Sequence, residues 1–182
     1  MSHDAATIRP LVDGDLERIR DFLSCIPEGE RRFFKDEAAA EGKPEVWFSE
    51  KRGCRILAVD SSGAVLGYAA VVPDVGWSSH VGEVALVVGP TSRGHGIGRE
   101  LAKSILREAV GLGLKKVVVE VVAEQTSTVE MFESLGFEGE ALLRDHICDR
   151  TGTLRDLIVL AYPVADHWAL LRTTGIEDAV GS

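Results

Sequence analysis

A glycine-rich segment in the middle of the chain constrains the fold more than any other feature. Residues 87–100 read VVGPTSRGHGIGRE, with Gly94, Gly96 and Gly98 at alternate positions between an apolar run and an amphipathic pattern. A strand that enters such a turn and continues as a helix points several backbone N–H groups and the positive end of the helix dipole at one place. Glycines suit this place because a Cβ would keep an anion from the amides, and because such turns need positive φ. The segment predicts either a phosphate-binding loop or a plain tight turn.

Two familiar phosphate loops are excluded by residue type. A Walker A loop ends in Gly-Lys-Ser/Thr, and a dinucleotide fingerprint reads Gly-x-Gly-x-x-Gly. Residues 93–98 read Arg-Gly-His-Gly-Ile-Gly, which matches neither pattern. We therefore expect neither a P-loop nucleotide site nor a dinucleotide fold.

Hydrophobic periodicity on either side of this segment predicts an alternation of strands and helices. An Asp-rich stretch is expected to cap the first helix, and Thr or Ser the short helix near residue 126. The strand at 114–122 is largely apolar, which predicts burial on both faces. In chain order we predict a strand at 6–12, a helix at 13–26, an irregular region at 27–53, strands at 54–60, 64–73 and 81–88, a helix at 98–113, a strand at 114–122, a helix at 126–136, strands at 137–149 and 154–163, and a helix at 165–175.

Composition limits the partners and the compartment. Lys and Arg total 20 against 29 Asp and Glu, a formal charge of -9, so we expect no general attraction to nucleic acid or to anionic membranes. No signal-like or membrane-length apolar run is present, and Cys25, Cys54 and Cys148 form no Cys-x-x-Cys pair. We predict a cytoplasmic protein with reduced thiols. No metal site is expected, since His146 and Cys148 have no third ligand in view.

Motif matches on both sides of the glycines point to a known family. Arg93, Gly96 and Gly98 fit the pattern Gln/Arg-x-x-Gly-x-Gly/Ala, and residues 131–137, MFESLGF, are similar to the signature lYeklGF. Residues 8–19, IRPLVDGDLERI, look like the family's opening strand and helix. The chain thus resembles the GNAT superfamily of acyl-CoA-dependent N-acyltransferases, with a loose similarity to its protein-lysine-acetylating branch.

The resemblance implies an α/β fold with a GNAT-type mixed central sheet of about seven strands flanked by helices. We expect one acetyltransferase domain over residues 1–182, with a core at about 5–163 and a C-terminal helix and tail at 164–182. In that helix, Trp168, Leu170 and Leu171 either cover the sheet or contact another subunit, as in a homodimer.

The resemblance also implies acetyl-CoA as the cosubstrate, bound where the fourth and fifth strands splay. Backbone groups of the fourth strand would pair with the pantetheine arm as an added strand does. Gln125 stands where the family often has an Asn before the short helix. The implied cofactor-binding residues are Leu86, Val87, Val88, Arg93, Gly94, His95, Gly96, Ile97, Gly98, Arg99 and Gln125.

Acyl transfer to an amine needs a group that removes the ammonium proton. Glu83 occupies the position that resembles the glutamate base of many family members, so we predict it as the general base. Glu120 on the next strand is the rival, and a solvent-facing carboxylate is the alternative for Glu83. The family's usual acid is a tyrosine, but this chain has Phe132 there. Tyr68 is a weak substitute, because a tyrosine on such a strand more often packs in the core.

The predicted function is N-acetyl transfer from acetyl-CoA to a primary amine, either a small molecule or a protein lysine. An acyl-CoA-binding module or sensor with little or no catalysis is the alternative, motivated by Phe132 and Gln125. Acidic residues near the expected acceptor loops suit a cationic acceptor, and they equally suit a solvated surface. These acceptor segments are 25–48, 74–80 and 142–156.

Overall fold

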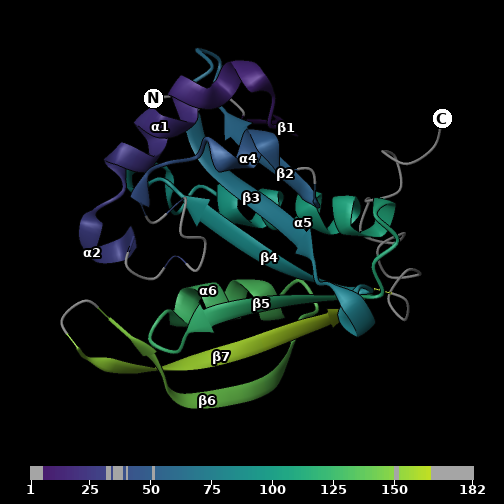
Figure 1. The fold of residues 1–182 in the computed structure, drawn as a ribbon. Helices are drawn as coiled ribbons and strands as arrows, with labels where there is room; N and C mark the ends of the chain where they lie inside the picture. Colours follow the sequence, from purple (N-terminus) through teal and green to yellow (C-terminus); the bar gives the residue numbers. More distant parts are fainter. Residues whose placement is uncertain are drawn as a thin grey trace.

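The core of the protein is a mixed β-sheet with helices packed on both faces (Figure 1). The computed structural model describes residues 6–31, 34, 39, 41–50, 52–149 and 152–164. Within these residues the sheet has seven strands in the order β1-β2-β3-β4-β5-β7-β6. The strands are β1 (Thr7–Pro10), β2 (Cys54–Val59), β3 (Val65–Pro73), β4 (Val81–Val88), β5 (Lys116–Val122), β6 (Glu138–Cys148) and β7 (Leu154–Pro163).

Strand direction confirms the predicted mixed sheet. β4 and β5 run parallel, and the other neighbouring strands run antiparallel. A parallel pair needs a crossover connection, which α5 (Ile97–Gly111) supplies between β4 and β5. The α/β class and the predicted order of strands and helices are therefore confirmed over the described residues.

The two faces of the sheet carry separate hydrophobic clusters. On one face α5 packs against β2, β3 and β4, because Leu101, Ile105 and Ala109 recur at helical spacing and are fully buried. On the other face α1 (Leu16–Cys25) and α4 (Val46–Ser49) form a smaller cluster around Tyr68 and Trp47. Shorter segments complete the described helices: η1 (Asp13–Asp15), α2 (Glu28–Arg31), η2 (Gly76–Ser78), η3 (Pro90–Ser92) and α6 (Thr126–Glu133).

The Asp-rich stretch caps the first turn at η1, where the Asp15 carboxylate accepts from the Val12 N–H, whereas the expected Thr or Ser cap of α6 is wrong. Asp15 makes no capping bond to α1; its buried carboxylate accepts hydrogen bonds from Arg9 at 2.6 and 2.7 Å and from the Val12 N–H at 3.1 Å. The charged guanidinium is the stronger partner, and it draws the carboxylate towards β1. In α6 the N-cap is Gln125 rather than Thr or Ser, and its side chain makes no capping bond.

β5 departs from the prediction that it is buried on both faces. Val117, Val119 and Val121 are buried in the α5 cluster, whereas Val118 and Glu120 are only half-buried. Side chains on a strand alternate between faces, so Glu120 points away from this cluster. The alternation leaves one face of β5 available to a site.

The predicted C-terminal helix and its apolar residues lie outside the described residues. Among the residues that are described, no helix is long and apolar enough to cross a membrane. The same part of the chain contains no group of three or more His, Cys, Asp or Glu side chains placed to hold a metal ion.

Candidate active site

The site begins where the pairing of the two parallel strands stops. β4 pairs with β5 from Val81, opposite Lys116, to Val84, opposite Val119, although β4 itself continues to Val88. On its other side β4 stays paired with β3 as far as Val88. One edge of residues 85–88 is therefore not paired with β5, and a cavity of about 610 Å³ opens beside it.

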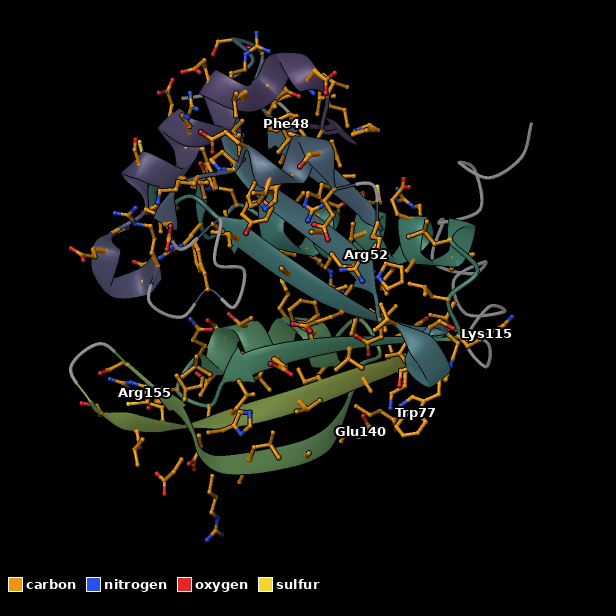
Figure 2. All side chains as sticks on the ribbon, viewed as in Figure 1. Phe48, Arg52, Trp77, Lys115, Glu140 and Arg155 are labelled. Carbon is orange, nitrogen blue, oxygen red and sulfur yellow. The ribbon has the colours of Figure 1, made fainter. Side chains whose placement is uncertain are left out.

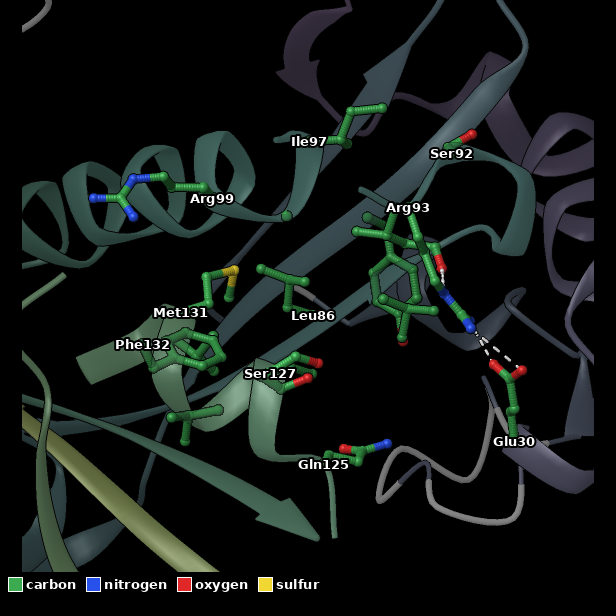
Figure 3. A pocket seen from close by; sticks show the side chains of 18 of the residues that line it. Glu30, Leu86, Ser92, Arg93, Ile97, Arg99, Gln125, Ser127, Met131 and Phe132 are labelled. Carbon is green, nitrogen blue, oxygen red and sulfur yellow. Dashed lines mark hydrogen bonds and ion pairs between the residues drawn. The ribbon is translucent and has the colours of Figure 1, made fainter. Parts of the chain in front are cut away.

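This cavity gathers nearly all of the predicted site residues (Figure 3). Glu83 and its rival Glu120 line it, together with the positions predicted to bind pantetheine and most of the glycine loop. His95 is the exception, because it belongs to the loop but does not line the cavity. The predicted residues that line it are Glu83, Leu86, Val87, Val88, Arg93, Gly94, Gly96, Ile97, Gly98, Arg99 and Gln125.

The loop has the backbone geometry that its glycines predicted. Gly94 and Gly96 have φ of 76° and 81°, and Gly96 is the N-cap of α5. The first N–H groups of a helix have no partner within the helix. The first residues of α5 line the cavity, so these N–H groups lie at its wall. Gly98 has no positive φ and packs among side chains, since a Cβ there would lie in van der Waals contact at 3.4 Å from both Met131 Sδ and Val88 Cγ2. The result is a helix N-terminus with the geometry that suits a phosphate.

Two arginines border this N-terminus. Arg99 donates from Nη1 to Ser134 Oγ at 2.8 Å, which holds it against the end of α6. Arg93 turns towards α2: its Nε donates to the Val88 carbonyl at 3.2 Å, and its Nη atoms bind the carboxylate of Glu30. Figure 3 shows this pair at the side of the cavity opposite α6.

Glu83 and Glu120 face the same side of the sheet. Val84 and Val119 are buried in the α5 cluster, so Glu83 and Glu120, each next to one of them, point to the opposite face. Glu83 lies opposite Val118, two residues before Glu120. The two carboxylates therefore belong to one wall, on the face of the sheet away from α5.

The aromatic residues of the cavity differ in what they offer. Phe132 is 1% exposed and packs edge-on against Phe137 at a centroid distance of 5.0 Å. It forms part of the cavity wall and has no group that can donate a proton. Tyr68 lines the cavity from β3, while its ring packs against Phe22 and Trp47. The packing agrees with the expectation that Tyr68 is mainly a core residue.

Some lining residues were not predicted individually. Glu30 and Phe34 come from the region that was expected only to shape the acceptor side, and Ser92 precedes the loop. Trp77, in the other expected acceptor loop, does not line the cavity; it is 96% exposed and projects from η2 (Figure 2). The α6 residues Ser127, Thr128 and Met131 also line the cavity, and no signal in the sequence marked them individually.

The fold and this geometry agree with the matches to known proteins. The profile described as Acetyltransferase (GNAT) family matches residues 16–137, about two thirds of the chain. The chain therefore belongs to the GNAT acetyltransferase family, whose cosubstrate is acetyl-CoA.

Individual relatives are more distant. A mycothiol acetyltransferase of Pseudarthrobacter chlorophenolicus is 36% identical over 85 residues, which are 45% of this chain and 26% of that protein. A GCN5-related N-acetyltransferase from Kribbella flavida is 26% identical, with a TM-score of 0.70 over 87% of this chain and 98% of that one. A phosphinothricin acetyltransferase of Sinorhizobium meliloti, solved with AcCoA, is 21% identical, with a TM-score of 0.71 over 87% and 88% of the two chains.

Proposed function

We propose that this chain transfers an acetyl group from acetyl-CoA to a primary amine. The observation that carries the proposal is the open edge of β4 at residues 85–88, which leads directly into a glycine loop at the start of a helix. An extended amide-bearing arm fits a strand edge, and a pyrophosphate fits a helix N-terminus. Acetyl-CoA has both parts in this order.

In this proposal the cofactor lies along the walls described above. Backbone groups of Leu86 and Val87 pair with the pantetheine arm, and the loop amides from Gly94 to Arg99 hold the pyrophosphate. Gln125 lines the same cavity and offers a side-chain amide to the cofactor. This arrangement directs the thioester towards the paired part of the sheet, where Glu83 lies.

Glu83 is proposed as the general base. A primary amine has a pKa near 10.4 and is mostly protonated at neutral pH, so a base is needed before attack. The ammonium first gives a proton to Glu83, directly or through one water. The neutral amine nitrogen then bonds to the thioester carbonyl carbon, the C–S bond breaks, and the second proton lost from the nitrogen passes through water to the leaving thiolate. Glu120 is the rival base because it lies on the same wall.

The leaving thiolate needs less help than the amine. A thiol has a pKa of about 8.5, so its thiolate is a good leaving group and takes a proton from water near neutral pH. The absence of a hydroxyl at Phe132 therefore does not prevent turnover. Tyr68 is a secondary candidate for this proton, since it lines the same cavity.

The acceptor is proposed to be a cationic amine, either a small molecule or a protein lysine. The carboxylates of Glu30, Glu83 and Glu120 all line the cavity and would attract an ammonium group. The chain spans only 26% of the mycothiol acetyltransferase that it matches, so the acceptor of that enzyme does not indicate the acceptor of this chain. A cytoplasmic location is also proposed, supported by the free thiols of Cys25, Cys54 and Cys148.

A thiol-release assay tests the proposal. The protein is incubated with acetyl-CoA and a panel of mono-amines, polyamines and lysine peptides, and the free CoA thiol is followed with and without each amine. Amine-dependent release that is lost in Glu83→Gln supports the proposal. Tight acetyl-CoA binding without release across the panel would instead support the acyl-CoA sensor that Phe132 motivates.

A further inference from the structure

One ion pair joins the cofactor loop to a distant part of the chain. The guanidinium of Arg93, at the start of the loop, binds the carboxylate of Glu30 in α2 in a two-pronged arrangement, with Nη1 to Oε1 at 3.3 Å. Its Nε donates to the Val88 carbonyl, the last residue of β4. The guanidinium therefore faces along the cavity wall towards α2, and both members of the pair line the cavity.

We propose that Glu30 is an internal competitor for Arg93, which sets the affinity of the cavity for the cofactor. This inference rests on the proposed function, because it assumes that an anionic cofactor enters beside the loop. When a phosphate group arrives, it takes the place of the Glu30 carboxylate on the Nη atoms of Arg93.

Guanidinium chemistry makes the exchange possible. Arg binds carboxylates and phosphates with the same fork of parallel N–H bonds, so Glu30 occupies donors that a phosphate oxygen would use. A phosphate carries more charge than a carboxylate and gains further bonds from the loop amides. The exchange therefore replaces one anion by a stronger one at the same donors.

Exposure makes the pair easy to break. The side chains of Arg93 and Glu30 are 47% and 41% exposed, and an ion pair at this exposure changes an equilibrium constant by about fivefold or less. The Arg9–Asp15 pair, whose carboxylate is fully buried, lacks this property. Glu30 can thus weaken cofactor binding without blocking it.

The test is a calorimetric titration of CoA, which needs no acceptor and no turnover. Glu30→Gln is expected to bind CoA about two- to fivefold more tightly than the wild type. Arg93→Met is expected to bind more weakly, and Glu30→Gln combined with Arg93→Met should bind no more tightly than Arg93→Met alone. This last comparison isolates the pair, since the gain exists only while Arg93 is present.

Two matched variants control for charge and for ion-pair loss. Glu45→Gln breaks the Arg20–Glu45 pair, which has similar exposure of 39% and 45%, away from the cavity lining, and should leave the affinity unchanged. Glu100→Gln removes a carboxylate in the first turn of α5 that pairs with Lys103 one turn further on. It reports how the loss of one negative charge near the loop changes the CoA affinity. Its gain is expected to be smaller than that of Glu30→Gln.

The outcomes separate the two proposals. If the wild type binds CoA and Glu30→Gln binds it no more tightly, the competitor role is overturned and the proposed function stands. The same holds if Glu30→Gln still raises the CoA affinity in the Arg93→Met background. Absence of CoA binding by the wild type overturns both. The competitor role is supported if the CoA affinities follow the predicted order and Glu45→Gln binds CoA like the wild type.

Discussion

The two halves of β4 belong to one continuous strand but have different neighbours. Residues 81–84 are paired on both edges, with β3 and with β5, whereas residues 85–88 are paired only with β3. The first half carries Glu83, and the second half leads into the glycine loop. Figure 1 shows β4 and β5 moving apart between α2 and α6.

The difference shows how an ordinary sheet can provide a cofactor site. Full pairing fixes the first half in place, so a carboxylate there has a defined position. The second half keeps backbone donors and acceptors for a ligand, because β5 turns away and the cavity lies beside it. Changes in the second half should alter binding, and changes in the first half should alter chemistry or stability.

The largest effect is expected from Gly96→Glu, in the loop that follows the open half. It places a like charge where the pyrophosphate is proposed to bind, so acetyl-CoA affinity should fall at least a hundredfold in calorimetry. Gly113→Glu is the matched control, because Gly96 and Gly113 have φ of 81° and 74° with nothing within 4 Å of an added Cβ. Equal loss in both variants would show that backbone strain, and not the site, is responsible.

Glu83→Gln tests the paired half by removing the proposed base. We expect kcat to fall about a hundredfold, the usual scale for general base catalysis, while the acetyl-CoA dissociation constant stays within about threefold. Steady-state kinetics and calorimetry separate the two quantities. Glu120→Gln should cost less than tenfold in kcat, and a larger loss there than in Glu83→Gln would transfer the role to Glu120.

Asp15 provides a reference outside both halves of β4. The hydrogen bonds from Arg9 are the main cause that lowers the pKa of Asp15 from 3.8 to about 2. A lowered pKa contributes stability that is complete above about pH 4 and is lost as the pH falls towards 2. Asp15→Asn should cost about 2 kcal/mol of unfolding free energy at pH 7 and make the acid loss shallower, with unchanged CoA affinity. Denaturant unfolding between pH 2 and pH 7 measures both, and an unchanged acid profile would contradict the assignment.

The smallest effect is expected in the paired half, from Gly82→Ala. The added Cβ would lie 2.4 Å from Leu114 Cδ1 and 2.9 Å from Val71 Cγ2, so side chains of the core must move. Overpacking of this kind costs about 1–2 kcal/mol, which a shift of the urea midpoint would detect. Gly111→Ala, with nothing near its added Cβ, should raise the midpoint instead. A higher midpoint in Gly82→Ala would mean that this half is looser than described.

The loop was predictable from the sequence because its constraint is local. Left-handed backbone favours glycine, so Gly94 and Gly96 indicated such a turn, and both have positive φ. The order of strands and helices along the chain followed in the same way from short apolar runs and turns. Gly98 was predicted for the right place, but its contact with Met131, which belongs to a different element, was not.

The remaining features depend on which elements meet in three dimensions. Nothing local in the sequence says that Glu30 reaches an arginine 63 positions away. The Asp-rich stretch was expected to cap the first helix, but its neighbours in sequence do not reveal that the Asp15 carboxylate also binds Arg9 on the adjoining strand. The half-burial of Glu120 likewise depends on where β5 leaves β4, which the apolar run of β5 does not reveal.

Backbone amide hydrogen exchange with and without acetyl-CoA would show whether the cofactor binds along the open half of β4. Acetyl-CoA should slow exchange in residues 85–88 and in the loop at 93–99, while residues 81–84 should change little because both of their edges are already paired. Protection that is absent from residues 85–88, or that is equal in both halves of β4, would contradict this mode of binding.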